Sequence, residues 1–208
     1  MDNTASLRQK HQFTWNEVAA LIIPLIIEQA LSILIGMADT MMVSNSGEAA
    51  VSAVSIIDNL SALLTTLFSA FSTGGAVVVS QYLGAGNERK ARDTAKNLIY
   101  LALGFSLLII MVLIPFRRSV IDLLYGMIEP DVRSNALDYL FYIALSYPFL
   151  ALYSALAALS RSEKKSSRTM TVSVMMNIMN IAGNAVMIYG FGMAAKGAAI
   201  SSLAARAA

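Results

Sequence analysis

Three acidic residues lie inside long apolar stretches of this sequence, where a charge is costly. Glu28 and Asp39 share one stretch, eleven residues apart, and Asp58 lies in the next. A charged side chain near the bilayer centre costs at least about 2.5–3.5 kcal/mol, so acids in such places usually serve a function. Eleven residues are close to three helical turns, which puts Glu28 and Asp39 on nearly the same helix face. The pattern favours binding of a proton or a cation inside a membrane.

Each of these acids also has a structural interpretation. Asp39 could reach the outer membrane interface or cap a neighbouring helix. Hydrogen bonding near the cytoplasmic end explains Glu28 at least as well as transport does. For Asp58, lining of a pore and a contact between helices are equally compatible with the pattern.

Three asparagines follow in a later apolar stretch. Asn177, Asn180 and Asn184 are spaced by three and four residues, so they form one stripe on a helix. A single membrane asparagine is commonly a packing contact worth about 0.6 kcal/mol. Three in line instead favour the lining of a water-filled cavity.

The residue content argues against an enzyme. The chain has no cysteine and one histidine, His11, in the polar N-terminal segment, so thiol catalysis, disulfides and a zinc site are excluded. There is no Ser/His pairing, and the Gly84-Ala85-Gly86 turn is interpreted as a helix stop and not as a nucleotide site. The net charge of +2 gives no indication of nucleic-acid binding.

The elements that would position these groups are membrane-spanning helices. Of the 208 residues, 57% are hydrophobic and 13% are charged. A soluble domain is about 25% charged, so much of this surface must face lipid. A spanning helix needs about 20 mainly apolar residues. We therefore predict an all-α integral membrane protein, a polytopic bundle of five full transmembrane helices plus a truncated sixth.

The predicted spans follow the apolar stretches in order. They are residues 18–43, 50–84, 97–114, 137–159 and 170–189, with a sixth run from Gly197. The second exceeds the bilayer thickness, so it must tilt, project into the cytoplasm or bend, most easily at Gly74-Gly75. The fourth contains Pro148. Residues 116–136 fit either a short amphipathic surface helix or an ordinary loop.

The loop charges predict the orientation. Ten Lys and Arg residues fall on one side of the predicted spans and four on the other. An excess of these residues marks the cytoplasmic face, which places the N-terminus in the cytoplasm of a multi-pass protein of the cell membrane. No small-residue cleavage site follows the first apolar stretch, so we expect it to remain as a helix.

Several segments together resemble one transporter family. They are GMADTMMVS at residues 36–44, GEAAVSAV at 47–54, SQYLGAG at 80–86, the run from Asn180 to Gly190, and KGAAI at 196–200. In this order and spacing, they resemble MATE (multidrug and toxic compound extrusion) transporters over nearly the whole chain.

The resemblance implies a twelve-helix exporter built from two six-helix lobes. Such a protein moves organic, often cationic, compounds outward against H⁺ or Na⁺. Residues 1–16 would be a cytoplasmic tail, and residues 17–208 the N-terminal lobe, incomplete at helix six. The implied partners are drugs, the lipid bilayer, and a C-terminal lobe or a second copy of the chain. No cofactor beyond the coupling ion is expected, and no nucleic acid.

The resemblance also implies a cation-coupling site. By position its residues are Asp39, Asn180, Asn184 and Ser202, and the candidates for cavity lining are Glu28, Asp58 and Asn177. Some family members carry a second acid where this chain has Asn184, so Asp39 is expected to be the sole titrating or charge-balancing ligand. Burial favours the neutral form of a carboxyl group and a nearby cation favours the charged form, so Asp39 could exchange a proton or Na⁺. Carboxylate, amide and hydroxyl oxygens suit these ions and not a transition metal.

Other functions remain open. A lipid or oligosaccharide flippase of the same superfamily would need several basic residues in its cavity, and the interiors of helices one to five have none. The chain could also be a non-transporting membrane subunit or fragment, or associate with itself into a two-lobed dimer. We expect that the 208-residue chain alone does not transport.

Overall fold

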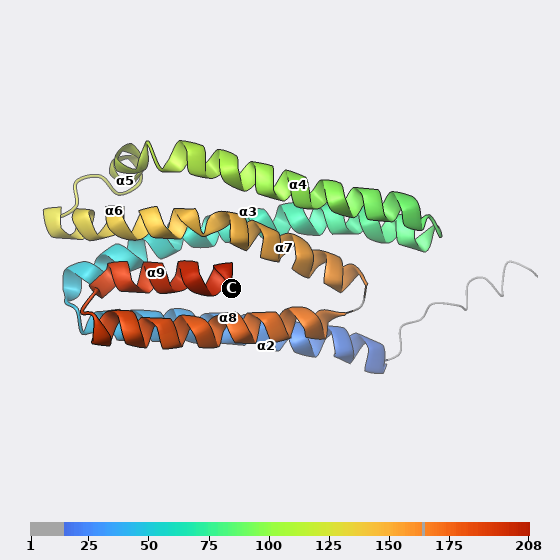
Figure 1. The fold of residues 1–208 in the computed structure, drawn as a ribbon, viewed down its shortest axis with the longest axis horizontal. Coiled ribbons are helices and arrows are strands. Elements are labelled where there is room, and N and C mark those ends of the chain that lie inside the picture. The colour runs from blue at the N-terminus through green and yellow to red at the C-terminus, as the bar shows by residue number, and fades with distance from the viewer. Residues whose placement is uncertain (1–14, 164) are drawn as a thin grey trace, which may run out of the picture.

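The structure, a computed structural model, describes residues 15–163 and 165–208, and these ranges form helices and no strand (Figure 1). The helices are α2 Trp15–Ser44, α3 Glu48–Gly84, α4 Glu88–Leu113, α5 Arg117–Tyr125, α6 Pro130–Leu145, α7 Tyr147–Ser162, α8 Ser166–Asn184, the π-helix η1 Ala185–Gly190 and α9 Ala194–Ala207. The all-α prediction is confirmed. Most of the predicted tail at residues 1–16, His11 included, lies outside the described residues.

The predicted number of spans agrees with the structure. The segment Ile22–Ser44 of α2, the helices α3 and α4, and the continuous run Ser166–Gly190 are each long and apolar enough to cross a membrane. Helices α6 and α7 pass the same test as a pair that is bent by 45°. By length and composition, the described residues therefore provide four unbroken spans and one span that is bent at a break.

The prediction of one helix at residues 137–159 is wrong. The span begins at Pro130 and breaks at Ser146, between α6 and α7. Pro148 is the cause, since it is the second residue of α7 and lacks the N–H that a continuous helix would need there. The Ser146 hydroxyl donates to the Ile143 carbonyl oxygen at 2.6 Å.

One of the two boundaries at the basic turn also differs from the prediction. Helix α4 begins at Glu88 and not at residue 97, because the Asn87 side chain caps it by accepting a hydrogen bond from the Lys90 amide at 3.1 Å. Helix α3 does end at Gly84, as predicted, and Gly86 makes the turn with a φ of 73°. Helix α3 runs as one helix through Gly74 and Gly75.

Both interpretations of residues 116–136 are partly right. Helix α5 is short and amphipathic, and it buries Ile121. The residues from Pro130 onward belong to α6 instead. Arg133 of α6 pairs with Asp122 of α5 at 2.5 Å, across the intervening loop.

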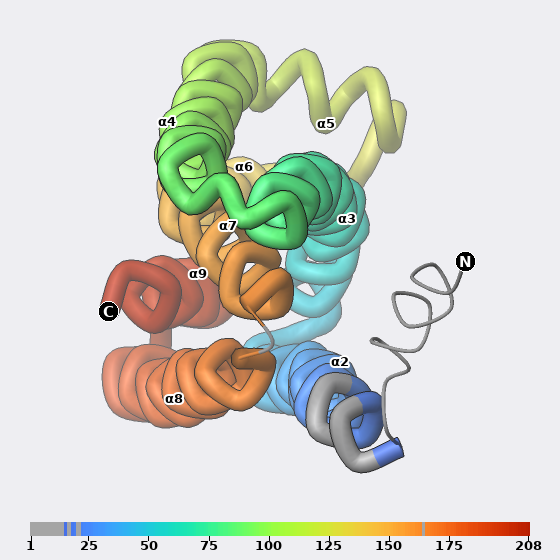
Figure 2. Tube along the Cα trace, turned by 90° about the vertical axis from the view of Figure 1, so that its right-hand side faces the viewer, coloured from blue at the N-terminus to red at the C-terminus, as the bar shows by residue number. Residues whose placement is uncertain are grey.

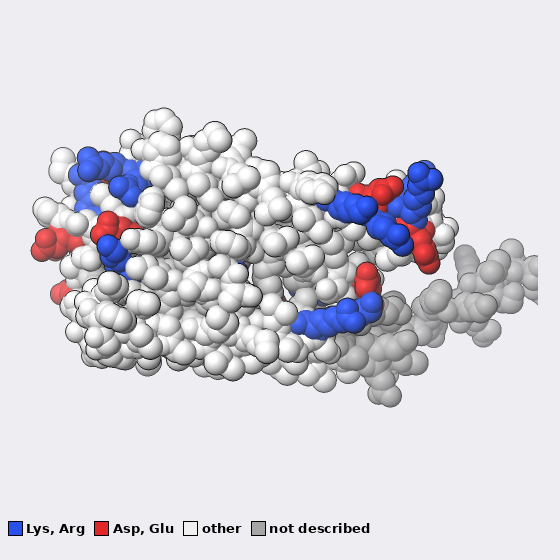
Figure 3. Space-filling view, viewed as in Figure 1, with Lys and Arg blue, Asp and Glu red and all other residues white. Residues whose placement is uncertain are grey.

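The helices pack as two groups, one made of α3, α4, α6 and α7 and the other of α2 and α8. Figure 2 shows α3, α6 and α7 between α4 on one side and α8 and α2 on the other. Helix α9 packs against both α6 and α8 and so joins the groups. In the face shown in Figure 3, charged side chains gather at the two ends and leave an uncharged band between them. That distribution is the one expected of a bundle that crosses a bilayer.

Candidate functional site

The centre of the candidate site is a contact between α2 and α8. The Asn184 side-chain amide donates a hydrogen bond to Asp39 Oδ1. Asn184 is fully buried, whereas Asp39 is half-buried. The two helices lie side by side and run in the same direction (Figure 1).

From Asn184 a chain of hydrogen bonds continues to α9. Asn184 Nδ2 also lies 3.4 Å from Asn180 Oδ1, one turn earlier on α8. Asn180 Nδ2 donates to Ser202 Oγ at 2.9 Å, and Ser201 Oγ donates to the Asn180 carbonyl oxygen at 2.8 Å. The structure thus brings Asp39, Asn180, Asn184 and Ser202 together from three helices.

Small residues allow these helices to approach closely. A Cβ added to Gly183 would lie 3.1 Å from Ser201 Cβ, and its contact with Ser201 Oγ would be closer still. A Cβ at Gly197 would lie 3.1 Å from Met187 Cβ. Glycine is therefore needed where α8 meets α9 and where η1 meets α9. The π-helical turn η1 begins directly after Asn184, and such turns occur frequently at functional sites.

The cluster has oxygen atoms free to bind a small cation. Within the described ranges, Asn184 Oδ1 is buried and receives no hydrogen bond. It lies on the same amide group that contacts the Asp39 carboxylate. Amide, carboxylate and hydroxyl oxygens fit a proton or an alkali cation. The part of the chain that the structure describes contains no group of three or more His, Cys, Asp or Glu side chains that could hold a metal.

The three cavity-lining candidates lie outside this hydrogen-bonded cluster. Asp58 Oδ1 accepts a hydrogen bond from Tyr139 at 3.1 Å, between α3 and α6. Asn177 donates to Ser173 at 3.5 Å within α8. The asparagine stripe is therefore divided, because Asn180 and Asn184 turn toward Asp39 and α9 while Asn177 contacts its own helix.

Glu28 is the third of these candidates and is 7% exposed. Its Oε1 accepts a hydrogen bond from the Tyr153 hydroxyl at 2.5 Å, which joins α2 to α7.

Sequence reasoning overlooked the tyrosines and one arginine. Tyr139 and Tyr147 are fully buried, and Tyr147 contacts Ser61 at 3.3 Å. Arg206, on α9, donates to the buried Ser146 Oγ at 2.7 Å. Arg206 stands out in the sequence as a charged residue among the small residues of α9, which could have marked it as functional. The tyrosines look like ordinary core residues in the sequence.

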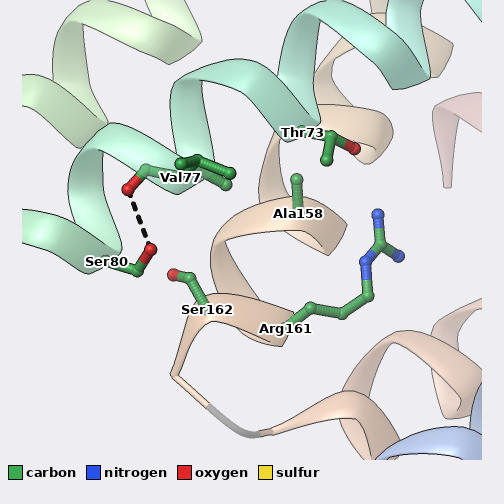
Figure 4. A pocket seen from close by; sticks show the side chains of 7 residues that line it. Thr73, Val77, Ser80, Ala158, Arg161 and Ser162 are labelled. Carbon is green, nitrogen blue, oxygen red and sulfur yellow. Dashed lines mark hydrogen bonds between the residues drawn. The ribbon is translucent and has the colours of Figure 1, made fainter.

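Two cavities lie near the basic end of the bundle, away from the Asp39 cluster. One of about 180 Å³ is bounded by α3 and α7, where Ser80, Ser162 and Arg161 surround it (Figure 4). The other, of about 260 Å³, shares Ser162 and extends to Arg92 of α4. No residue of the Asp39 cluster lines either cavity.

Comparison with known proteins gives one family. The family model MatE matches residues 24–186. The uncharacterized transporter YisQ of Bacillus subtilis is 32% identical over 180 residues, which is 85% of this chain and 38% of that protein. A probable multidrug resistance protein NorM of Thermotoga maritima is 28% identical over 194 residues, 91% of this chain and 41% of the relative. The multidrug export protein MepA of Staphylococcus aureus is 28% identical over 189 residues, 88% of this chain and 41% of the relative.

Solved structures agree with these sequence relatives on the fold. A MOP superfamily transporter from Pyrococcus furiosus superimposes with a TM-score of 0.86 at 20% identity, covering 92% of this chain and 42% of the other. An outward-facing multidrug resistance MATE family transporter gives the same TM-score of 0.86, identity of 20% and coverage of 92% and 42%. The chain spans about two fifths of the length of the proteins it matches.

Proposed function

The chain belongs to the MatE family of membrane transporters, and from that premise we propose that it forms the N-terminal lobe of a multidrug exporter. The exporter would move organic, often cationic, compounds out of the cell against H⁺ or Na⁺. NorM and MepA are named for multidrug resistance and multidrug export, which supports this substrate class. The proposed lobe works with a second lobe, supplied by a C-terminal part or by another copy of the chain.

The hydrogen bond between Asn184 and Asp39 is the observation that carries the proposal. It puts a membrane carboxylate beside a buried amide whose oxygen has no donor in the described ranges. A cation that binds Asp39 can use this amide oxygen as a second ligand. Cation binding at Asp39 would also change the contact that joins α2 to α8, because the amide and the cation compete for the same carboxylate.

Coupling to transport follows from the same arrangement. Asp39 lies on α2, whereas Asn180 and Asn184 lie on α8 and Ser202 on α9. An ion that alters the cluster therefore alters how three helices pack against one another. In an alternating-access exporter, substrate and ion favour different packing states, so each ion released inward can accompany one outward substrate step.

Location and orientation are part of the proposal. We place the chain in the cell membrane with its N-terminus in the cytoplasm. At the α3–α4 and α7–α8 end, the described chain carries Arg89, Lys90, Arg92, Lys96, Arg161, Lys165 and Arg168. The opposite end carries Arg117, Arg118, Arg133 and Lys196. The richer end supports the cytoplasmic assignment.

A dye-efflux assay on Asp39→Asn tests the function. In cells that express the gene, the variant should lose efflux of a cationic dye while its level in the membrane is unchanged. The matched control is Asp93→Asn, an exposed acid on α4, which should leave efflux intact. Collapsing the H⁺ and Na⁺ gradients separately identifies the coupling ion. Undiminished, gradient-dependent efflux by Asp39→Asn would reject Asp39 as the coupling residue.

A further inference from the structure

Glu28 is buried in the inner half of the lobe with only part of its hydrogen-bonding capacity used. Its Oε1 accepts the bond from the Tyr153 hydroxyl, but Oε2 is buried and has no partner in the described ranges. No salt bridge joins it to a basic side chain in these ranges. A buried carboxylate oxygen without a hydrogen-bond donor is costly, so Oε2 is a candidate ligand for a cation.

Ser173 of α8 places a further hydroxyl beside Tyr153, the hydrogen-bond donor to Glu28. Helices α2 and α8 run side by side in the same direction, and Ser173 follows Glu28 by 145 residues, the same separation that joins Asp39 to Asn184. Parallel helices with equal rise repeat their pairing at a constant offset. Ser173 is buried, and its hydroxyl neighbours that of Tyr153. The amide of Asn177 donates to the same Ser173 oxygen.

Two groups of similar composition therefore lie along one helix pair. The outer group combines Asp39 with the amides of Asn184 and Asn180. The inner group combines Glu28 with the Tyr153 hydroxyl, and Ser173 lies beside Tyr153 and accepts from Asn177. The eleven residues between the acids correspond to about 16 Å along the helix, which is roughly half of the hydrocarbon core.

We infer that Glu28, Tyr153 and Ser173 form a second cation site, which takes H⁺ or Na⁺ on the inner half of the lobe. The carboxylate supplies the charge and the two hydroxyls supply neutral oxygens. Arg161 of α7 lies close enough to Tyr153 for its positive charge to act on that side chain. The inference deepens the proposed coupling function by giving the ion a second position between Asp39 and the cytoplasm.

Infrared difference spectroscopy of the purified protein in lipid nanodiscs tests the site, since a protonated carboxyl group has a carbonyl band that a carboxylate lacks. As the pH is changed, the wild type should show a titrating band that is lost in Glu28→Gln. The band should remain in Asp39→Asn and in Glu48→Gln, a control acid that is exposed at the start of α3. A difference spectrum of Glu28→Gln that matches the wild type would show a fixed charge state and overturn the inference.

A second variant covers failure of Glu28→Gln to fold. Tyr153→Phe should shift the frequency of the Glu28 band, because a carboxyl oxygen that loses a hydrogen bond absorbs at a different frequency. An unshifted band would contradict the geometry. Addition of Na⁺ at constant pH distinguishes the ligands, since a Na⁺ site loses the band on addition and a proton site does not.

The band also separates this inference from the proposed function. A band that disappears only in Glu28→Gln, together with normal efflux by Asp39→Asn, would retain the inner site and reject the role of Asp39. Loss of efflux by Asp39→Asn, with no Glu28 band in the wild type or in any variant, would support the role of Asp39 and reject the inner site.

Discussion

Arg206 Nη1 donates a hydrogen bond of 2.7 Å to Ser146 Oγ, at the residue where α6 ends and α7 begins. Ser146 is fully buried, and Arg206 is half-buried within electrostatic range of Asp39 and Asp58. A guanidinium inside a bilayer needs nearby acids to offset its cost. The contact therefore links α9, which carries Ser202, to the break in the bent span.

Replacing Arg206 should destabilise the bundle. Arg206→Ala removes the charged donor of the hydrogen bond to the buried Ser146 hydroxyl, so we expect a loss of about 1.5–3 kcal/mol in the free energy of unfolding. Thermal unfolding in detergent measures it. Arg118→Ala, at an exposed arginine of α5, is the control and should change stability by less than about 0.5 kcal/mol. Equal stability of the two variants would show that the contact with Ser146 is dispensable.

A second acid at position 184 should change the ion stoichiometry. Asn184→Asp places a carboxylate where a buried amide now contacts Asp39. Two carboxylates at this distance repel each other unless a cation binds between them, so the variant should bind one more H⁺ or Na⁺ than the wild type. Isothermal titration with Na⁺, and proton release on Na⁺ addition, give the number. Asn135→Asp, which changes an amide on α6 to an acid away from Asp39, should leave the number unchanged.

The close approach of α8 and α9 predicts an effect of Gly183→Ala. The new Cβ would overlap Ser201, so the helices must separate and the hydrogen bond between Ser201 and Asn180 is strained. We expect a loss of about 1–3 kcal/mol in unfolding free energy. Gly104→Ala on α4 meets open space and should instead stabilise by about 0.5–1 kcal/mol. Chemical unfolding monitored by circular dichroism compares the two, and a neutral Gly183→Ala would argue against the packing described.

Tyr139 should be needed to hold Asp58. Tyr139→Phe removes the hydroxyl that donates to Asp58 at 3.1 Å and leaves a partly buried carboxylate without that donor. We expect a loss of about 1–3 kcal/mol in the free energy of unfolding, measured by thermal unfolding in detergent. Tyr100→Phe removes an exposed hydroxyl on α4, where the ring is 69% exposed, and should have no measurable effect. If Tyr100→Phe caused the same loss, the effect would come from removing any tyrosine hydroxyl and not from the contact with Asp58.

Helix existence could be predicted more reliably than helix ends. The apolar stretches predicted every span, because crossing a bilayer requires long runs of apolar residues whatever the packing. The apolar pattern predicts the start of α4 nine residues late, since its first turns are polar and their helicity depends on the Asn87 cap. The sequence does not predict the break at Ser146 despite Pro148, because proline can kink a membrane helix without ending it.

The sequence by itself determined the membrane class and the residues of the candidate site. Asp39, Asn180 and Asn184 stand out because polar groups are rare and costly in apolar helices. Only the tertiary structure decided which of them meet. Asn184 contacts Asp39 and Asn177 does not, because helix register and the glycine contacts between α8 and α9 set the pairing. Tyr153 beside Glu28 and Arg206 beside Ser146 depend on residues far apart in the chain, which no local spacing reveals.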